Sequence, residues 1–245
     1  MLAAKNLTKA FGGLKALDEF SFDVRQGSIL GLIGPNGAGK TLTFDIITGA
    51  YQPDGGTVSF MGEPLTGLKV HEVALRGIVR TFQINRVFPK MTVMENILLA
   101  TDEKGLLSNI LSMMRAGREY HERALDMLKL VGLIDLRDEL AGNLSYGQQK
   151  LLGLACALIV HPEPKLLLLD EPVAGVNRTL ANRLLDLVRT MNRTGKTFIV
   201  IEHDMPAIMG ICDKVIVLDH GKKIAEGKPQ EIQSNERVIE AYFGR

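Results

Sequence analysis

The stretch GLIGPNGAGKT, residues 31–41, concentrates glycine, proline and one lysine directly after an apolar run. A glycine inside a regular element costs about 0.5–1 kcal/mol relative to alanine, so the backbone here must do something that side chains would obstruct. Gly34 to Thr41 fits the pattern G-x-x-x-x-G-K-[ST], in which backbone N–H groups wrap a phosphate, Lys40 adds charge and Thr41 offers a hydroxyl to Mg²⁺. A helix that begins here points its positive end at the same anion. The stretch predicts a phosphate loop, residues 34–41, rather than an ordinary glycine turn.

The size and charge of the chain narrow its class. It has 245 residues, 46% of them hydrophobic, which suffices for one large α/β domain with an inserted lobe. The formal net charge of +1 argues against a broad nucleic-acid surface. No apolar run reaches the roughly 20 residues that a membrane span needs, and no signal-peptide pattern is present, so we expect a soluble protein. Cys156 and Cys212 stand in apolar surroundings, which favours buried thiols in a reducing compartment.

Strand and helix patterns alternate at both ends of the chain, while the middle is helical. We therefore expect an α/β core formed by residues 1–84 and 161–245, with an antiparallel β subdomain, and a helical lobe over residues 85–160. Predicted strands cover residues 21–27, 28–34, 165–172 and 196–204, a short strand lies within 53–65, and 213–227 is a strand–turn–strand. Predicted helices cover residues 40–50, 91–100, 119–133 and 177–195.

Acidic and histidine side chains follow two of the apolar strands. Asp170 and Glu171 end LLLLDEP, where Asp170 is suited to hold Mg²⁺ and Glu171 to orient an attacking water. His203 follows the next strand and is suited to donate a hydrogen bond to a γ-phosphate. The alternatives are an acidic pair at a helix N-terminus and a structural histidine.

A second anion site is predicted at the start of another helix. In NLSYGQQKLLGL, Ser145 can cap the helix, and Gly147 and Gln148 leave its first N–H groups accessible. The alternative is a simple capped helix. Gln83, where the α/β pattern gives way to the helical one, is a weaker candidate for contact with Mg²⁺ or water.

These motifs, in this order, resemble the ATP-binding cassette ATPases over nearly the full chain. GPNGAGKT is similar to the Walker A motif, LLLLDE to Walker B and LSYGQ to the signature LSGGQ; Gln83 matches the Q-loop and His203 the switch histidine. The resemblance implies a P-loop NTPase fold, with ATP and Mg²⁺ as cofactors. It implies Glu171, His203 and Gln83 as catalytic residues and Thr41, Gln83 and Asp170 as metal ligands. The implied nucleotide contacts are Phe11, whose ring would stack on adenine, Asn36, Gly37, Ala38, Gly39, Lys40, Thr41, Leu42, Ser145, Gly147 and Gln148.

The resemblance also explains why one chain carries two anion sites. In this family two cassettes enclose two ATP molecules head to tail, and the signature of one contacts the γ-phosphate held by the other. Two positions depart from the family pattern: Tyr146 replaces a signature glycine, and Asn177 stands where many cassettes have aspartate. Tyr146 adds bulk at the dimer interface, and Asn177 removes a charge from a position that helps to couple the two sites.

A finer resemblance is to the ATPase subunit of bacterial branched-chain amino-acid importers, on AFGGLKAL, RTFQ, DEPVAGVN, IEHDM and the ending VIEAYFG. It implies three kinds of partner: a second, related ATPase, two membrane permeases and, indirectly, a periplasmic binding protein. It implies no nucleic-acid partner. It also implies a cytoplasmic location on the inner face of the membrane. The alternatives are a soluble cassette of the repair or iron–sulfur assembly type, and an ATP-gated clamp with little turnover.

Overall fold

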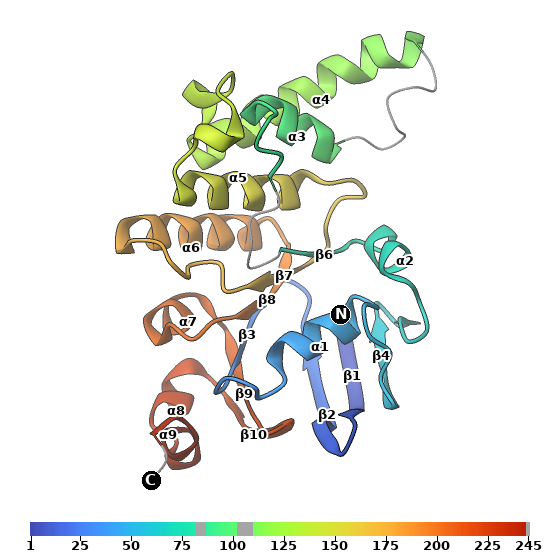
Figure 1. The fold of residues 1–245 in the computed structure, drawn as a ribbon, viewed down its shortest axis with the longest axis vertical. Coiled ribbons are helices and arrows are strands. Elements are labelled where there is room, and N and C mark those ends of the chain that lie inside the picture. The colour runs from blue at the N-terminus through green and yellow to red at the C-terminus, as the bar shows by residue number, and fades with distance from the viewer. Residues whose placement is uncertain (82–86, 102–109, 244–245) are drawn as a thin grey trace.

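The computed structural model describes residues 1–81, 87–101 and 110–243. Within those ranges the strands form two sheets (Figure 1). The first is antiparallel, in the order β2-β1-β4-β5. Its strands are β1 (Leu2–Phe11), β2 (Leu14–Val24), β4 (Gly55–Phe60) and β5 (Glu63–Pro64).

The second sheet has the order β10-β9-β3-β8-β7-β6 and is parallel except for the edge strand β10. Its strands are β3 (Ile29–Ile33), β6 (Ile78–Arg80), β7 (Leu166–Asp170), β8 (Thr197–Ile201), β9 (Lys214–Asp219) and β10 (Lys222–Gly227). Side chains on β7 and β8 alternate between two cores, because successive residues of a strand point to opposite faces. Leu167 and Phe198 pack into the core shared with the long helices, whereas Leu166 and Ile199 face α1 and the antiparallel sheet.

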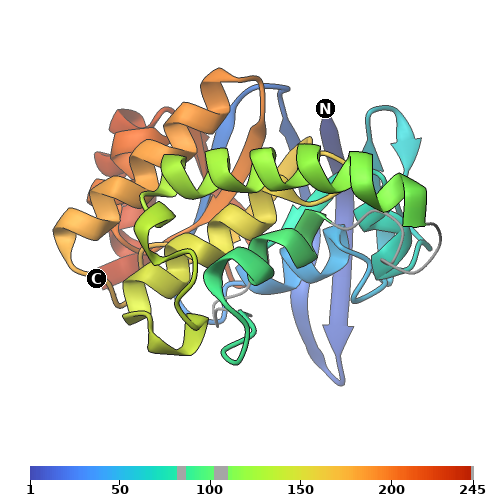
Figure 2. The same cartoon turned by 90° about the horizontal axis from the view of Figure 1, so that it is seen from above.

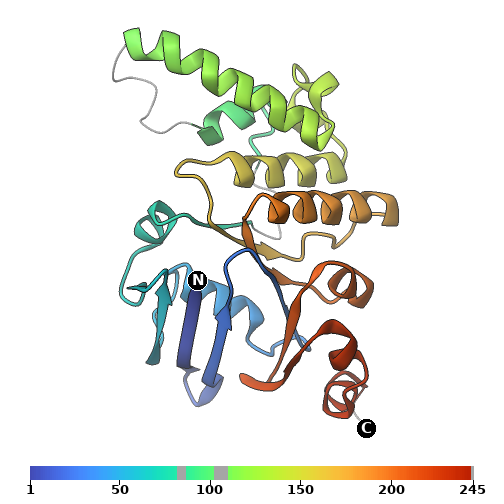
Figure 3. The ribbon, with the colours of Figure 1, turned by 180° about the vertical axis from the view of Figure 1, so that it is seen from behind.

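The helices cover the second sheet and continue away from it. They are α1 (Lys40–Ile47), α2 (Val70–Leu75), α3 (Val93–Thr101), α4 (Ile110–Val131), α5 (Tyr146–Ile159), α6 (Arg178–Arg193), α7 (Met205–Ile211), α8 (Pro229–Gln233) and α9 (Glu236–Phe243). The helices α3, α4 and α5 contact one another and lie at the end of the molecule farthest from β1 and β2 (Figures 1 and 3). Figure 2 looks onto this end, with α4 nearest the viewer.

The fold confirms the predicted P-loop type, with a mixed sheet, an antiparallel sheet and inserted helices. One strand boundary was wrong, because β2 begins at Leu14 and ends at Val24 rather than covering residues 21–27. The predicted helix 119–133 is the second half of α4. Within the described ranges, no helix combines the length and the apolar character that crossing a bilayer requires.

Candidate functional site

The phosphate loop runs from the end of β3 into the first turn of α1. Gly37 and Gly39 have φ values of 81° and 103°, a left-handed region that glycine adopts without strain. A Cβ on Gly39 would lie 2.7 Å from the carbonyl oxygen of Ala16, so no larger residue fits there. The N–H of Gly221, in the turn between β9 and β10, donates to the Ala38 carbonyl at 3.0 Å. The loop is therefore held in place by both sheets, and Asn36 and Gly37 remain exposed at its tip.

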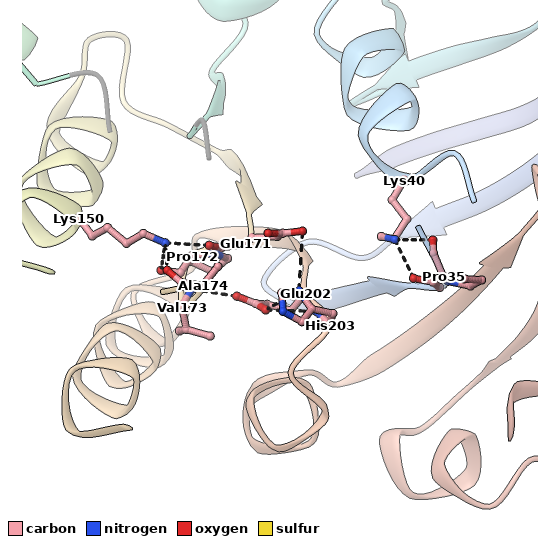
Figure 4. A network of polar contacts seen from close by, with 10 residues as sticks. Pro35, Lys40, Lys150, Glu171, Pro172, Val173, Ala174, Glu202 and His203 are labelled. Atoms are coloured by element: carbon pink, nitrogen blue, oxygen red, sulfur yellow. Dashed lines mark hydrogen bonds and ion pairs between the residues drawn. The ribbon is translucent and has the colours of Figure 1, made fainter. Parts of the chain in front are cut away.

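Lys40 lies between this loop and the acidic end of β7. Its ammonium donates to the carbonyls of Gly34 at 2.7 Å and Pro35 at 2.8 Å (Figure 4). Burial lowers the pKa of Lys40, and the nearby charges of Glu171 and Asp170 oppose that shift. Next to it, the Thr41 residue is exposed and Leu42 is half-buried in the first turn of α1. A cation, a helix N-terminus and a glycine-rich backbone converge here, which is the chemistry that a polyphosphate requires.

Asp170 is buried at the carboxyl end of β7. One of its oxygens accepts a hydrogen bond from Arg80 at 2.9 Å, and the other side of the same guanidinium pairs with Asp45 on α1. Burial raises the pKa of Asp170, while the Arg80 hydrogen bond acts in the opposite direction. Arg80 was not predicted from the sequence, because the carboxylates that it joins lie far from it along the chain. Gln83, three positions further on, lies outside the described residues.

Glu171 follows immediately and has an unusual backbone. Its φ is 49°, in the left-handed region where a non-glycine residue is strained, and its N–H donates to the Ile201 carbonyl at 2.9 Å. The Glu171 carboxylate lies 3.7 Å from Nδ1 of His203, whose side chain is 62% exposed (Figure 4). The structure therefore brings together Lys40, Glu171 and His203, which the sequence analysis selected from three separate motifs.

Two charged groups that the sequence analysis missed support this edge of the sheet. Lys150 on α5 is only 6% exposed, and its ammonium donates to the carbonyls of Glu171, Pro172 and Ala174. Glu202 is 1% exposed and accepts hydrogen bonds from two backbone N–H groups, that of Val173 at 2.8 Å and that of His203 at 3.2 Å. Together they tie the segment after β7 to α5 and to β8 (Figure 4).

The predicted second anion site begins α5. The Ser145 hydroxyl accepts from the Gln148 N–H at 3.3 Å, while the Gln148 side chain accepts from the Ser145 N–H at 2.9 Å, which forms a capping box. Gly147 is buried, because Leu180 of α6 covers it: a Cβ there would lie 1.8 Å from a methyl group of Leu180. The packing of α6 therefore requires this glycine whether or not it also faces an anion. Tyr146, in contrast, is 51% exposed.

Asn177, the other departure from the family pattern, has a structural task. Its side chain accepts from the Leu180 N–H at 3.0 Å and so caps α6. An aspartate would do the same, so the amide keeps the cap while removing a charge.

Phe11 is the last residue of β1 and is 47% exposed. Its ring contacts Tyr51 edge-on, with centroids 5.7 Å apart. Asp54 holds this strand end by accepting from the Ala10 N–H at 2.8 Å and from Lys9. Phe11 is thus held on a fixed backbone and its ring is partly exposed, with the Lys9 ammonium 5.7 Å from the ring centroid. An exposed aromatic ring of this kind can stack on a base. Tyr51 is a second aromatic there that the sequence analysis did not select.

Comparison with known sequences gives two family matches. A model described as ABC transporter matches residues 17–174, and one described as branched-chain amino acid ATP-binding cassette transporter matches residues 222–245. The high-affinity branched-chain amino acid transport ATP-binding protein LivG of Salmonella typhimurium is 41% identical over 251 residues, covering 100% of this chain and 98% of that protein. BraF of Pseudomonas aeruginosa, which has the same description, is 39% identical and is also 98% covered.

Solved structures of ATP-binding cassettes are similar to this chain in three dimensions. The ADP conformation of MJ1267, an ATP-binding cassette of an ABC transporter, has a TM-score of 0.87 at 35% identity, over 100% of this chain and 99% of that one. The dimeric post-hydrolysis state of the cassette MJ0796, bound to ADP and Pi, has a TM-score of 0.78 at 26% identity, over 94% and 99% of the two chains. The likeness to MJ1267 therefore extends over the whole chain.

Proposed function

Because this chain belongs to the ABC transporter family of ATP-binding cassettes, we propose that it is the ATP-hydrolysing subunit of an importer for branched-chain or related amino acids. The relatives that carry this description match it over its whole length at about 40% identity. A separate model of branched-chain transporter cassettes matches its last 24 residues, which lie outside the general family match. That agreement favours the importer over a soluble cassette with no membrane partner.

One observation carries the hydrolytic part of the proposal: the Glu171 carboxylate lies 3.7 Å from His203 and near the ammonium of Lys40. In this proposal Lys40 holds the outer phosphates and His203 donates a hydrogen bond to the γ-phosphate. Glu171 orients the attacking water and accepts its proton. An ATP-gated clamp without turnover would not need a strained glutamate at this point.

The oxygens of Thr41 and Asp170 fit a magnesium site, because Mg²⁺ prefers hard oxygen ligands and keeps several of its waters. We infer that Thr41 would contact the ion directly and that Asp170 would contact it through water, with Gln83 as a further candidate. When bound, Mg²⁺ neutralises charge on the phosphates. Arg80 holds the Asp170 carboxylate in one orientation beside α1.

The signature residues Ser145, Gly147 and Gln148 would serve a nucleotide held by a second cassette. The dimeric structure of the related cassette MJ0796 with ADP and Pi supports this arrangement. We propose a related, non-identical ATPase as the mate, two permeases and, indirectly, a periplasmic binding protein as further partners. The helices within residues 85–160 would form the lobe that contacts the permeases, with the chain on the inner face of the membrane.

Glu171→Gln tests the chemistry. The variant should bind ATP as well as the wild type and accumulate an ATP-bound dimer, which light scattering detects. Its hydrolysis should be at least a hundredfold slower, because a general base contributes a rate factor of about 10²–10⁴. Glu163→Gln, at an exposed carboxylate that pairs with Lys196, is the matched control. Normal turnover by Glu171→Gln would remove this glutamate as the base.

Uptake tests the transport assignment. Cells that lack this chain should lose accumulation of labelled leucine, isoleucine and valine, and the wild-type chain, but not Glu171→Gln, should restore it. Membrane fractionation should recover the chain with the membrane only when its neighbouring permeases are expressed. Unchanged uptake together with a soluble distribution would favour the soluble cassette.

A further inference from the structure

The last helix of the chain reaches the nucleotide end of the molecule. A cleft of about 900 Å³ is lined on one side by residues 35–38 of the phosphate loop and on the other by Arg237, Glu240 and Ala241 of α9. The helix also contacts β10, beyond the edge of the second sheet (Figure 1). Residues of β10 and α9, which lie within the stretch matched by the branched-chain transporter model, therefore border the phosphate loop.

Tyr242 is, with Val238, one of the residues of α9 that face the core. Its ring packs against the core, and its hydroxyl oxygen is buried. That oxygen lies beside the Gly34 backbone, yet within the described ranges it has no partner with hydrogen-bonding geometry. Burial raises the pKa of Tyr242, and the adjacent Gly34 backbone offsets part of the rise. A buried hydroxyl without a partner destabilises the fold, so its position requires an explanation.

Gly34 is the first residue of the phosphate loop and leaves no room for a side chain. A Cβ on it would lie 1.9 Å from the Leu218 carbonyl oxygen at the end of β9. Its own carbonyl accepts a hydrogen bond from the Lys40 ammonium at 2.7 Å. The same peptide segment is thus in contact with Tyr242 and with the lysine that would bind the phosphates.

We propose that Tyr242 is a positioning residue for the phosphate loop, and that its hydroxyl completes a hydrogen bond with the Gly34 backbone when nucleotide is held. The inference rests on the proposed binding of ATP. Lys40 must release the Gly34 and Pro35 carbonyls to reach the phosphates, which frees this peptide to reorient. The hydroxyl then gains a partner only in the loaded state, so it favours that state. By linkage, nucleotide must in turn stabilise the docking of α9 by the same factor.

Tyr242→Phe tests the proposal, because it removes the hydroxyl and keeps the ring. The affinity for MgATP in calorimetric titration should fall about five- to tenfold, as expected for the loss of one net hydrogen bond. The nucleotide-free variant should melt at the wild-type temperature or above it, because an unpartnered buried hydroxyl has been removed. A merely structural tyrosine would show the opposite pattern, with a lower melting temperature and unchanged affinity. Tyr120→Phe, on α4, is the matched control.

Hydrogen exchange gives a second, independent readout. MgATP should slow amide exchange in residues 236–243 of the wild type, and the slowing should shrink in Tyr242→Phe. Unchanged affinity in Tyr242→Phe, or exchange in α9 that does not respond to MgATP in the wild type, would overturn the proposal. A wild-type chain that binds no MgATP would instead overturn the proposed function.

Discussion

Lys150 offers the most direct test of how the active edge of the sheet is supported. Its ammonium comes from α5 and donates to three backbone carbonyls of the segment after β7, those of Glu171 at 3.1 Å, Pro172 at 3.3 Å and Ala174 at 2.7 Å. Lys150→Met keeps the unbranched apolar part of the side chain but removes the ammonium and its three donors. We expect the variant to lose stability and, because Glu171 belongs to the released segment, to lose turnover as well.

The magnitude follows from opposing effects. Hydrogen bonds from a charged donor are worth about 1.5–3 kcal/mol each, and a buried carbonyl without a partner carries a comparable cost. Two of the three hydrogen bonds are long. The ammonium has also lost hydration on burial, which is why the pKa of Lys150 is lowered. These effects reduce the sum, and we expect a net loss of about 2–4 kcal/mol in the free energy of unfolding.

Urea denaturation of the nucleotide-free chain measures this loss. Lys129→Met is the control, because Lys129 is exposed on α4 and forms only a surface pair with Asp126, so its loss should cost under about 0.5 kcal/mol. In ATPase assays Lys150→Met should lower kcat more than it raises KM. A variant as stable as the wild type would show that the three carbonyls find other partners and that the supporting role assigned to Lys150 is wrong.

Three further outcomes are expected. Lys40→Ala should weaken ATP binding at least tenfold in fluorescent-nucleotide titrations, since charge-assisted phosphate contacts are among the strongest hydrogen bonds, and unchanged affinity would contradict the assignment of the loop. Phe11→Ala should weaken it by about 1–3 kcal/mol, the range for base stacking on an aromatic ring, whereas no change would point to Tyr51 as the stacking residue. Burial raises the pKa of Glu202 above its ordinary 4.5, so as the pH rises from 4.5 through the folded-state pKa the folded chain keeps a proton that the unfolded chain releases, and stability falls. Glu202→Gln, which keeps an acceptor for the Val173 N–H, should flatten that slope in thermal melts, and an unchanged slope would assign it to other groups.

The parts of the fold that were predictable from sequence are those whose signals are local. The phosphate loop is recognisable from eight consecutive residues. The strands β7 and β8 are apolar except for Asp170 and Thr197, and every position is buried because both faces of each strand are covered. In contrast, β1 was not predicted as a strand. Its pairing with β2 shifts register between Ala4 and Leu7 and again before Lys9, and Asn6 has a φ of 50°, so the period-two pattern is broken.

The functional candidates divide in the same way. Glu171 and His203 were identifiable because each follows a recognisable strand, although only the three-dimensional structure shows that they lie together. Lys150, Glu202 and Arg80 were missed because their partners are distant in sequence, and for the first two the partners are backbone groups that carry no residue-specific signal. Arg80 and Asp170, for example, are 90 positions apart.

The backbone conformation of Glu171 opposes thermal stability to catalytic turnover. A φ of 49° suits glycine or asparagine better than glutamate, so exchange for either should relax the main chain and let the protein withstand more heat. The same exchange would discard the carboxylate that we propose acts on the water. Selection for thermal stability alone would therefore replace Glu171 and yield inactive proteins, and only selection for transport retains the glutamate.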